Sequence, residues 1–165
     1  MNFKILSHAC LSIIEDDFNL IIDPWIIGSC YWRSWWNYPE VEQKHLDNLK
    51  ADALYLTHLH WDHFHGPSLK KYFQKDIKIY VPKVLTKRMV DDLSYLGFDN
   101  VIEIPHGVPK KISKNMEICS YQFGPGVDSG LIVSTKDHNL LNINDCKTFG
   151  LSLKQIKNRY ENIDF

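Results

Sequence analysis

The chain has 165 residues, of which 44% are hydrophobic and 24% are charged, as in ordinary globular proteins. Its 19 basic and 20 acidic side chains give a net charge of −1, so the composition gives no reason to expect nucleic acid or an anionic membrane surface as a partner. No apolar run approaches the roughly 20 residues that a membrane-spanning helix needs.

The four cysteines are widely spaced and form no C-x-x-C pair, which predicts reduced and mostly buried thiols. The N-terminal sequence M-N-F-K-I-L-S-H lacks the basic-then-apolar pattern of a secretory signal. Both observations favour a cytoplasmic protein. The length suits one domain with a substantial core, and we expect a single domain over residues 1–165.

The first part of the chain predicts a group of strands followed by a loop rich in aromatic residues. Asp16 and Asp17 suggest a tight hairpin between the second and third strands, and Pro24 ends the third. The expected elements are strands at residues 3–6, 10–15 and 18–24, an aromatic loop at 31–39 and a short helix at 41–50.

Strands and helices alternate through the middle of the chain, and strands return towards its end. This order predicts a mixed sheet with helices outside it. The expected strands are residues 53–56, 77–81, 101–104, 116–121, 130–135 and 139–144, with a strand-like end at 162–165. The expected helices begin at Gly66-Pro67-Ser68 and cover residues 82–96, closed by Gly97, and 151–160.

The stretch T-H-L-H-W-D-H-F-H-G, residues 57–66, holds four of the eight histidines. Residues two apart at the end of a strand point the same way, so His58 and His60 can aim two imidazoles at one point. Asp62 and His63 follow in a turn and could serve a second point nearby. Such ligands suit zinc, or iron or manganese. The simpler interpretation is a histidine-rich surface loop without metal.

At these residues the chain resembles the metallo-β-lactamase superfamily, whose hallmark H-x-H-x-D-H is matched by His58, His60, Asp62 and His63. S-H-A-C-L-S-I resembles the opening strands of its lactonase and phosphodiesterase-like branch. L-I-I-D-P-W, with Asp23, resembles the segment whose aspartate supports the metal ligands. L-L-N-I-N-D-C, with Asp145, resembles the segment whose aspartate bridges the two metal ions. Longer segments, D-P-W-I-I-G and R-S-W-W among them, look closest to the metallo-β-lactamase-like part of CMP-N-acetylneuraminate hydroxylase.

The resemblance implies an α/β (α+β) fold, the αβ/βα metallo-β-lactamase-like sandwich, with two mixed sheets face to face and the metal site at one edge between them. It implies that Asp145 bridges two ions. Asp23 would accept a hydrogen bond from a ligand imidazole. His8 would point into the cleft, or else be a half-buried strand histidine. The expected cofactors are one or two divalent ions, zinc foremost, with iron or manganese as alternatives.

The chain departs from the superfamily pattern at two ligands. Counting back from Asp128, the usual third histidine of the first site falls on Gly124, which has no side chain. The last histidine of the second site normally lies in a C-terminal half that would begin near Phe165. We therefore expect a sandwich that lacks part of its C-terminal half, with an edge that a homo-oligomer or partner covers.

Three functions are compatible with these residues. The first is a metal-dependent hydrolase, in which a metal-bound hydroxide oriented by Asp62 attacks a small-molecule ester, lactone or phosphodiester. The second is a hydroxylase-like component that acts on a nucleotide sugar with iron and a separate electron donor. The third is a degenerate, non-catalytic binding domain. The hydrolase is the function that we expect, and Gly124 and the position of the chain's end are the evidence for the third alternative.

A cluster of aromatic residues surrounds Arg33 in the loop before the first expected helix. The cluster could line a pocket for a sugar or flat ligand, with Arg33 binding an anionic group. Alternatively it holds a long loop against the domain, or forms a subunit contact. Its members are Trp25, Tyr31, Trp32, Trp35, Trp36 and Tyr38.

Overall fold

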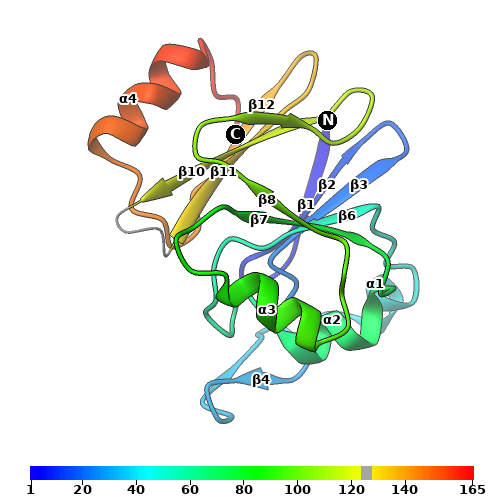
Figure 1. Cartoon of the computed structure of the whole chain (residues 1–165). Helices are drawn as coiled ribbons and strands as arrows, with labels where there is room; N and C mark the ends of the chain where they lie inside the picture. The colour runs from blue at the N-terminus through cyan, green and yellow to red at the C-terminus, as the bar shows by residue number, and fades with distance from the viewer. Residues whose placement is uncertain (124–127) are drawn as a thin grey trace.

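The computed structural model describes residues 1–123 and 128–165, and in them two β-sheets pack face to face with helices outside (Figure 1). The expected αβ/βα sandwich is confirmed. The larger sheet contains β1 (Asn2–Ser7), β2 (Cys10–Glu15), β3 (Phe18–Ile22), β6 (Ala53–Tyr55), β7 (Lys78–Pro82) and β8 (Val101–Ile104), in that order. The smaller sheet has the order β12 (Asn139–Asn142), β11 (Asp128–Ser134), β10 (Glu117–Phe123) and β9 (Pro109–Lys111).

The larger sheet is mixed, whereas the described strands of the smaller sheet are all antiparallel. Strands β3, β6, β7 and β8 are parallel, so the chain must cross over between them, and helices occupy these crossovers. They are α1 (Gln43–Asp47), α2 (Gly66–Tyr72) and α3 (Arg88–Tyr95). The three helices gather on one face of the larger sheet, opposite the smaller sheet (Figure 1).

Alternation of buried side chains along β3 explains why this strand lies in the middle of the fold. Leu20 and Ile22 face the smaller sheet and pack with Ile118, while Ile21 faces the helices and packs with Leu69. A strand segment buried on both faces is a continuous apolar run, as L-I-I at residues 20–22 is here. The core between the sheets therefore fixes the strand that leads to Asp23.

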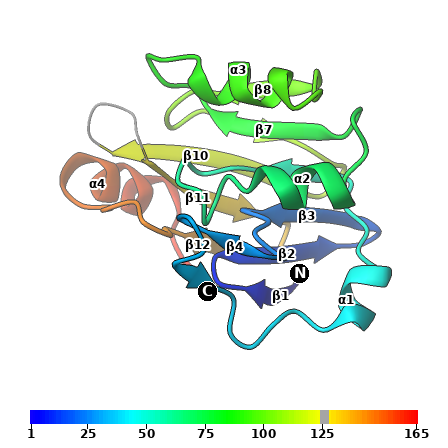
Figure 2. The same cartoon turned by 90° about the horizontal axis from the view of Figure 1, so that it is seen from below.

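Helix α4 (Gly150–Arg159) covers the outer face of the smaller sheet, beside β10 and β11 (Figures 1 and 2). Ile156 packs there against Cys119, Tyr121 and Ile132. The end of the chain runs along β12 with two backbone hydrogen bonds, at Leu141 and Asn139, but forms no strand. The strand expected at residues 162–165 was wrong because two bonds are too few for a ladder.

Three other elements differ from the expectation. Helix α3 begins at Arg88 and not at Pro82, because Pro82 continues β7 and is paired with Ile104 of β8. The short strand β9 escapes prediction because P-K-K has no apolar pattern. The aromatic loop folds as a small hairpin of β4 (Ser29–Cys30) and β5 (Trp35–Trp36), which protrudes from the domain (Figure 1).

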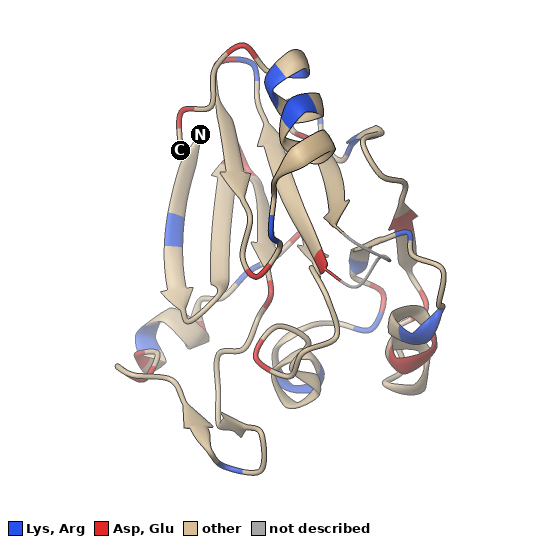
Figure 3. Ribbon diagram, turned by 90° about the vertical axis from the view of Figure 1, so that its left-hand side faces the viewer, with Lys and Arg blue, Asp and Glu red and all other residues tan. Residues whose placement is uncertain are grey.

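The surface carries charges of both signs on helices and loops, and the strands are mostly uncharged (Figure 3). All four cysteines are buried and unbridged, as the spacing predicts. Within the described part of the chain, no helix has the length and apolar character needed to cross a bilayer.

Candidate metal centre

The site forms where the carboxyl ends of the parallel strands β3 and β6 meet. The two strands run side by side, with Ile22 opposite Tyr55, so the residues that follow each strand share one edge of the sheet. Asp23 directly follows β3, and the histidine stretch follows β6. The turn after β1 adds His8, and the loop after β12 adds Asp145. Four distant segments thus converge on one place.

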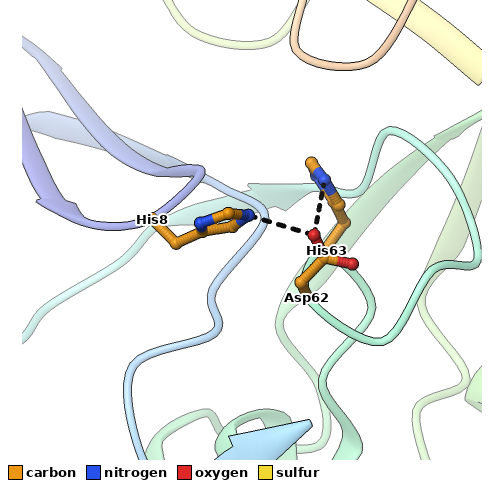
Figure 4. Close-up of side chains that lie close together, drawn as sticks. All are labelled: His8, Asp62 and His63. Carbon is orange, nitrogen blue, oxygen red and sulfur yellow. Dashed lines mark hydrogen bonds and ion pairs between the residues drawn. The ribbon is translucent and has the colours of Figure 1, made fainter. Parts of the chain in front are cut away.

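His8, Asp62 and His63 form the first group of side chains that could hold a metal ion, with one ligand atom from each lying within 4.8 Å of the others. The Nε2 atom of His8 lies 3.0 Å from Oδ2 of Asp62, and Nε2 of His63 lies 3.4 Å from the same oxygen. Figure 4 shows both rings turned towards the Asp62 carboxylate. His8, which lies in the turn after β1, thus faces the Asp62 carboxylate.

His58, His60 and Asp145 form the second group. Nε2 of His58 lies 2.8 Å from Nδ1 of His60 and 3.7 Å from Oδ2 of Asp145. The same Asp145 oxygen is 3.6 Å from Nε2 of His63, so its carboxylate faces both groups. The side chains of His60 and Asp145 are about half exposed, at 55% and 51%, and therefore leave the centre accessible from solvent.

Asp23 is completely buried and is hydrogen-bonded to residues that orient both groups. Nδ1–H of His63 donates to its Oδ2 at 2.8 Å, which leaves Nε2 with its lone pair facing the first group. The Thr57 hydroxyl donates to the same carboxylate at 2.7 Å, and it accepts a hydrogen bond from Nδ1 of His58 at 3.0 Å. Nε2 of His58 is thereby turned towards the second group.

The residues present fit a metal ion. Nε2 of His63 is buried and lacks a hydrogen-bond partner among the described residues, although it lies close to the carboxylates of Asp62 and Asp145. A buried, unpartnered imidazole nitrogen is costly, and a cation shared with these carboxylates would satisfy it. The fit rests on this nitrogen and on a donor set made of imidazoles and carboxylates.

Burial and neighbouring charges shift the pKa values of the buried ligands in different directions. Burial, followed by the charge of His63, lowers the pKa of His58. Burial alone would also lower the pKa of His63, but the hydrogen bond and charge of Asp23 outweigh it and raise that pKa. Burial opposes ionisation of Asp62, yet the hydrogen bond from Tyr31 and the charge of His63 hold its pKa below the ordinary value.

Tyr31 of the aromatic cluster donates a hydrogen bond of 2.6 Å from its hydroxyl to Oδ1 of Asp62. Its ring stacks on Trp61, which comes from the histidine stretch itself, with ring centroids 5.8 Å apart. Trp25 and Trp35 of the same cluster pack edge-on against the His8 ring. Sequence reasoning grouped Tyr31 with its aromatic neighbours, and no local pattern distinguishes it from Trp32. Only the folded hairpin reveals the contact.

Several other predicted candidates lie outside the two groups. His65 is buried and caps the start of α2, where its Nδ1 accepts from the backbone N–H of Ser68. His106 accepts from the backbone N–H of Gln122 and is a structural link. Gly124 lies outside the described residues.

A cavity of about 300 Å³ opens beside the first group, between the β1–β2 edge of one sheet and β12 of the other. His8 and Asn144 line the end nearest the site. The rest of the lining is mainly apolar and includes Phe3, Ile5 and Leu140. The cavity therefore suits an apolar group brought next to the metal ligands.

Comparisons with known proteins identify several that share this fold. The sequence model of the family described as "Beta-lactamase superfamily domain" matches residues 2–148. The cytidine monophosphate-N-acetylneuraminic acid hydroxylase of Mus musculus is 36% identical over 149 residues, which are 86% of this chain and 26% of that protein. The Sus scrofa hydroxylase is 34% identical over 85% of this chain and 34% of its own length. The chain thus spans about a quarter to a third of these relatives.

Solved structures add two enzymes of different chemistry with the same fold. A diiron β-hydroxylase from Streptomyces venezuelae superimposes with a TM-score of 0.75 at 18% identity, covering 97% of this chain and 32% of that one. An isothiocyanate hydrolase from Delia radicum gut bacteria superimposes with a TM-score of 0.72, also at 18% identity, covering 98% and 68%.

Proposed function

This chain belongs to the metallo-β-lactamase superfamily, and from that premise we propose that it holds a pair of iron ions and serves as the metal-bearing component of a hydroxylase. A separate electron donor supplies the electrons. The observation that carries the proposal is the composition of the two groups, each of which contains two histidines and one aspartate. Two histidines and one carboxylate with open positions are the ligand set of many non-haem iron oxygenases.

The side chains have distinct tasks in this proposal. His58, His60 and Asp145 hold one ion, and the first group holds the other. When bound, the ions supply activation of dioxygen for insertion into a C–H bond. Tyr31 keeps Asp62 ionised by donating its hydroxyl hydrogen, and Asp23 fixes the orientation of His63. The carboxylates offset the positive charge of the ions.

The cavity beside His8 supports an oxidation at carbon. A C–H bond is apolar, so the lining formed by Phe3, Ile5 and Leu140 suits the group to be oxidised. The relatives that are 34–36% identical are named as hydroxylases of a cytidine monophosphate-linked sugar acid. The substrate class that we propose is accordingly a nucleotide sugar, with its polar part outside the cavity.

Metal-dependent hydrolysis of an ester, lactone or phosphodiester is the second candidate. The observation that favours it is coverage, since the chain spans 68% of the isothiocyanate hydrolase but 32% of the diiron hydroxylase. Zinc would then be the metal, and it lowers the pKa of water towards neutrality. Asp62 would orient that water and accept its proton.

Metal content and product analysis test these candidates together. The protein is purified without chelator or added metal, and its iron and zinc are measured by mass spectrometry. We expect close to two irons per chain, and a product 16 Da heavier from CMP-N-acetylneuraminate with dioxygen and a chemical reductant. Zinc, with hydrolysis of 4-nitrophenyl acetate and no oxidation, contradicts the first candidate and supports the second. A chain that binds neither metal contradicts both.

His60→Ala and His45→Ala provide a matched pair for this experiment. His60 belongs to the second group, whereas His45 lies on α1 beside Lys4, away from the site. We expect His60→Ala to lose at least one ion and all oxidation, and His45→Ala to retain both. Full metal content in His60→Ala would show that the ions bind elsewhere.

A further inference from the structure

We propose that Asp128 is a ligand of the ion held by His58 and His60. This rests on the proposed function only in requiring a metal ion at that group, whichever reaction follows. Asp128 is the first residue of β11, four positions after Gly124. The superfamily pattern expects a histidine ligand at position 124, where this sequence has glycine. Asp128, in the described part of the smaller sheet, would supply a ligand in its place.

The carboxylate of Asp128 has the position and surroundings expected of a metal ligand whose ion is absent. Its Oδ1 atom is buried and has no hydrogen-bond partner among the described residues. That atom lies 3.8 Å from Nε2 of His58. Removing a carboxylate oxygen from water without any donor is unfavourable, and a cation between it and the imidazole would compensate for the loss.

The distance from Asp128 to His58 agrees with a shared ion, whereas the 2.8 Å between Nε2 of His58 and Nδ1 of His60 is a direct contact that an ion would replace. Two ligand atoms, each about 2.0–2.2 Å from one tetrahedral ion, lie roughly 3.3–3.6 Å apart, and they lie farther apart in a more open geometry. Asp145, which belongs to the group on other grounds, has its Oδ2 3.7 Å from the same His58 nitrogen. Asp128 and Asp145 therefore stand at nearly equal distances from His58.

The backbone holds Asp128 in this place. It is paired with Phe123 of β10, so it belongs to the sheet. The next residue, Ser129, is buried and donates its hydroxyl hydrogen to the carbonyl oxygen of Thr57, 2.9 Å away. Thr57 immediately precedes His58. The start of β11 is thus bonded directly to the segment that carries the metal-binding histidines.

With Asp128 the His58 group has two imidazoles and two carboxylates. Carboxylate oxygens suit manganese, and two histidines with a carboxylate suit non-haem iron, so a second carboxylate favours a harder metal than a site made mostly of imidazoles does. Each additional carboxylate also offsets positive charge on the ion. Replacement of a histidine by aspartate would therefore change the metal preference while retaining the site.

Cobalt binding to metal-free protein tests the ligand directly and needs no turnover. Wild type, Asp128→Asn, Asp128→His and Asp137→Asn are titrated with Co²⁺ against a competing chelator, and visible absorption reports the ligand geometry. Asp137 is an exposed aspartate in the turn after the same strand and serves as the control. Thermal unfolding of each metal-free variant shows whether it folds.

We expect Asp128→Asn to weaken binding of one of two cobalt ions by at least about tenfold. Asp128→His should retain both ions with an altered spectrum, and Asp137→Asn should match wild type. Unchanged affinity and spectrum in Asp128→Asn would overturn the proposal, as would lower stability of its metal-free form with unchanged binding. Asp128→Asn could bind cobalt more weakly than wild type while the iron-loaded protein fails to hydroxylate the substrate. In that case the proposed function would fail and the assignment of Asp128 as a ligand would stand.

Discussion

Asp23 is fully buried and accepts hydrogen bonds from the backbone and hydroxyl of Thr57, the ring of His63 and the amide of Asn144. These donors come from two separate segments, the histidine stretch and the loop after β12, so one carboxylate orders the site. Its φ of +45° places it in the left-handed region, which aspartate tolerates better than most residues. An aspartate after a strand is recognisable in the sequence, but the set of donors around it is not.

Asp23→Asn is expected to lower the free energy of unfolding by about 2 kcal/mol or more, because buried donors lose a charged acceptor. Metal affinity should fall roughly 10- to 100-fold, since His63 loses the partner that orients it. Urea denaturation and chelator competition measure the two effects. A variant with unchanged metal affinity would contradict the role given to Asp23.

The shifted pKa values of His63 and His58 predict opposite dependences of metal-free stability on pH. The raised pKa of His63 contributes stability below its unfolded value, near 6.5, and this contribution disappears as pH rises through the folded pKa. The lowered pKa of His58 contributes stability above about 6.5, which disappears as pH falls through its folded pKa. Denaturation of His63→Gln and His58→Gln across pH 5–9 should separate the two contributions.

At neutral pH, metal binding should release more protons from His63 than from His58, because the pKa of His63 is raised and the ion needs its Nε2 lone pair. His58 is neutral there and should release none. Titration calorimetry in two buffers of different ionisation enthalpy counts the protons. Proton release that is identical in wild type and His63→Gln would be the contrary result.

At the scale of elements, the β4–β5 hairpin is joined to the metal site through Tyr31. The hydroxyl bond to Asp62 and the stacking on Trp61 attach the hairpin at its tip, where Trp32 is 84% exposed. Tyr31→Phe removes the bond and retains the stacking. We expect faster hydrogen exchange over residues 29–36 and weaker metal binding by a few fold. Trp36→Phe is the control, because the Trp36 indole N–H donates to the Arg33 carbonyl within the hairpin, and it should leave metal binding unchanged.

The sequence predicts elements well where a single local pattern decides them. Apolar runs located the core strands, and the motif spacing located His58, His60, Asp62 and His63 on the strand-to-helix connection. His8 is different, because its contact with Asp62 joins residues 54 positions apart in the sequence. Such contacts depend on which strands become neighbours, and β1 reaches the site only because the larger sheet assembles.

At the scale of the whole molecule, the site joins the two sheets. The first group and the two motif histidines of the second belong to loops of the larger sheet, whereas Asp145 follows β12 of the smaller one. Ser129 and Thr57 add a direct bond between the sheets nearby. An ion bound here would therefore add a further link between two layers that meet through apolar packing and a few hydrogen bonds.

Metal should consequently stabilise the whole fold and not only its loops. At a free metal concentration 100 times the dissociation constant, we expect about 2.7 kcal/mol of added stability. Calorimetry should give a higher melting temperature for the loaded protein, and hydrogen exchange should slow in β11 and β12 as well as in the loops. Slower exchange confined to residues 57–66 would contradict coupling between the sheets.

His8 both lines the apolar cavity and contacts the Asp62 carboxylate. Occupancy of the cavity and of the metal group would be thermodynamically linked if a bound molecule fixed the orientation of His8. A molecule that holds His8 in its ligand orientation raises the affinity for the ion, and the ion raises the affinity for that molecule by the same factor. Substrate and metal would then each increase the affinity for the other. The metal affinity measured without substrate would be lower than the affinity of the substrate-bound protein.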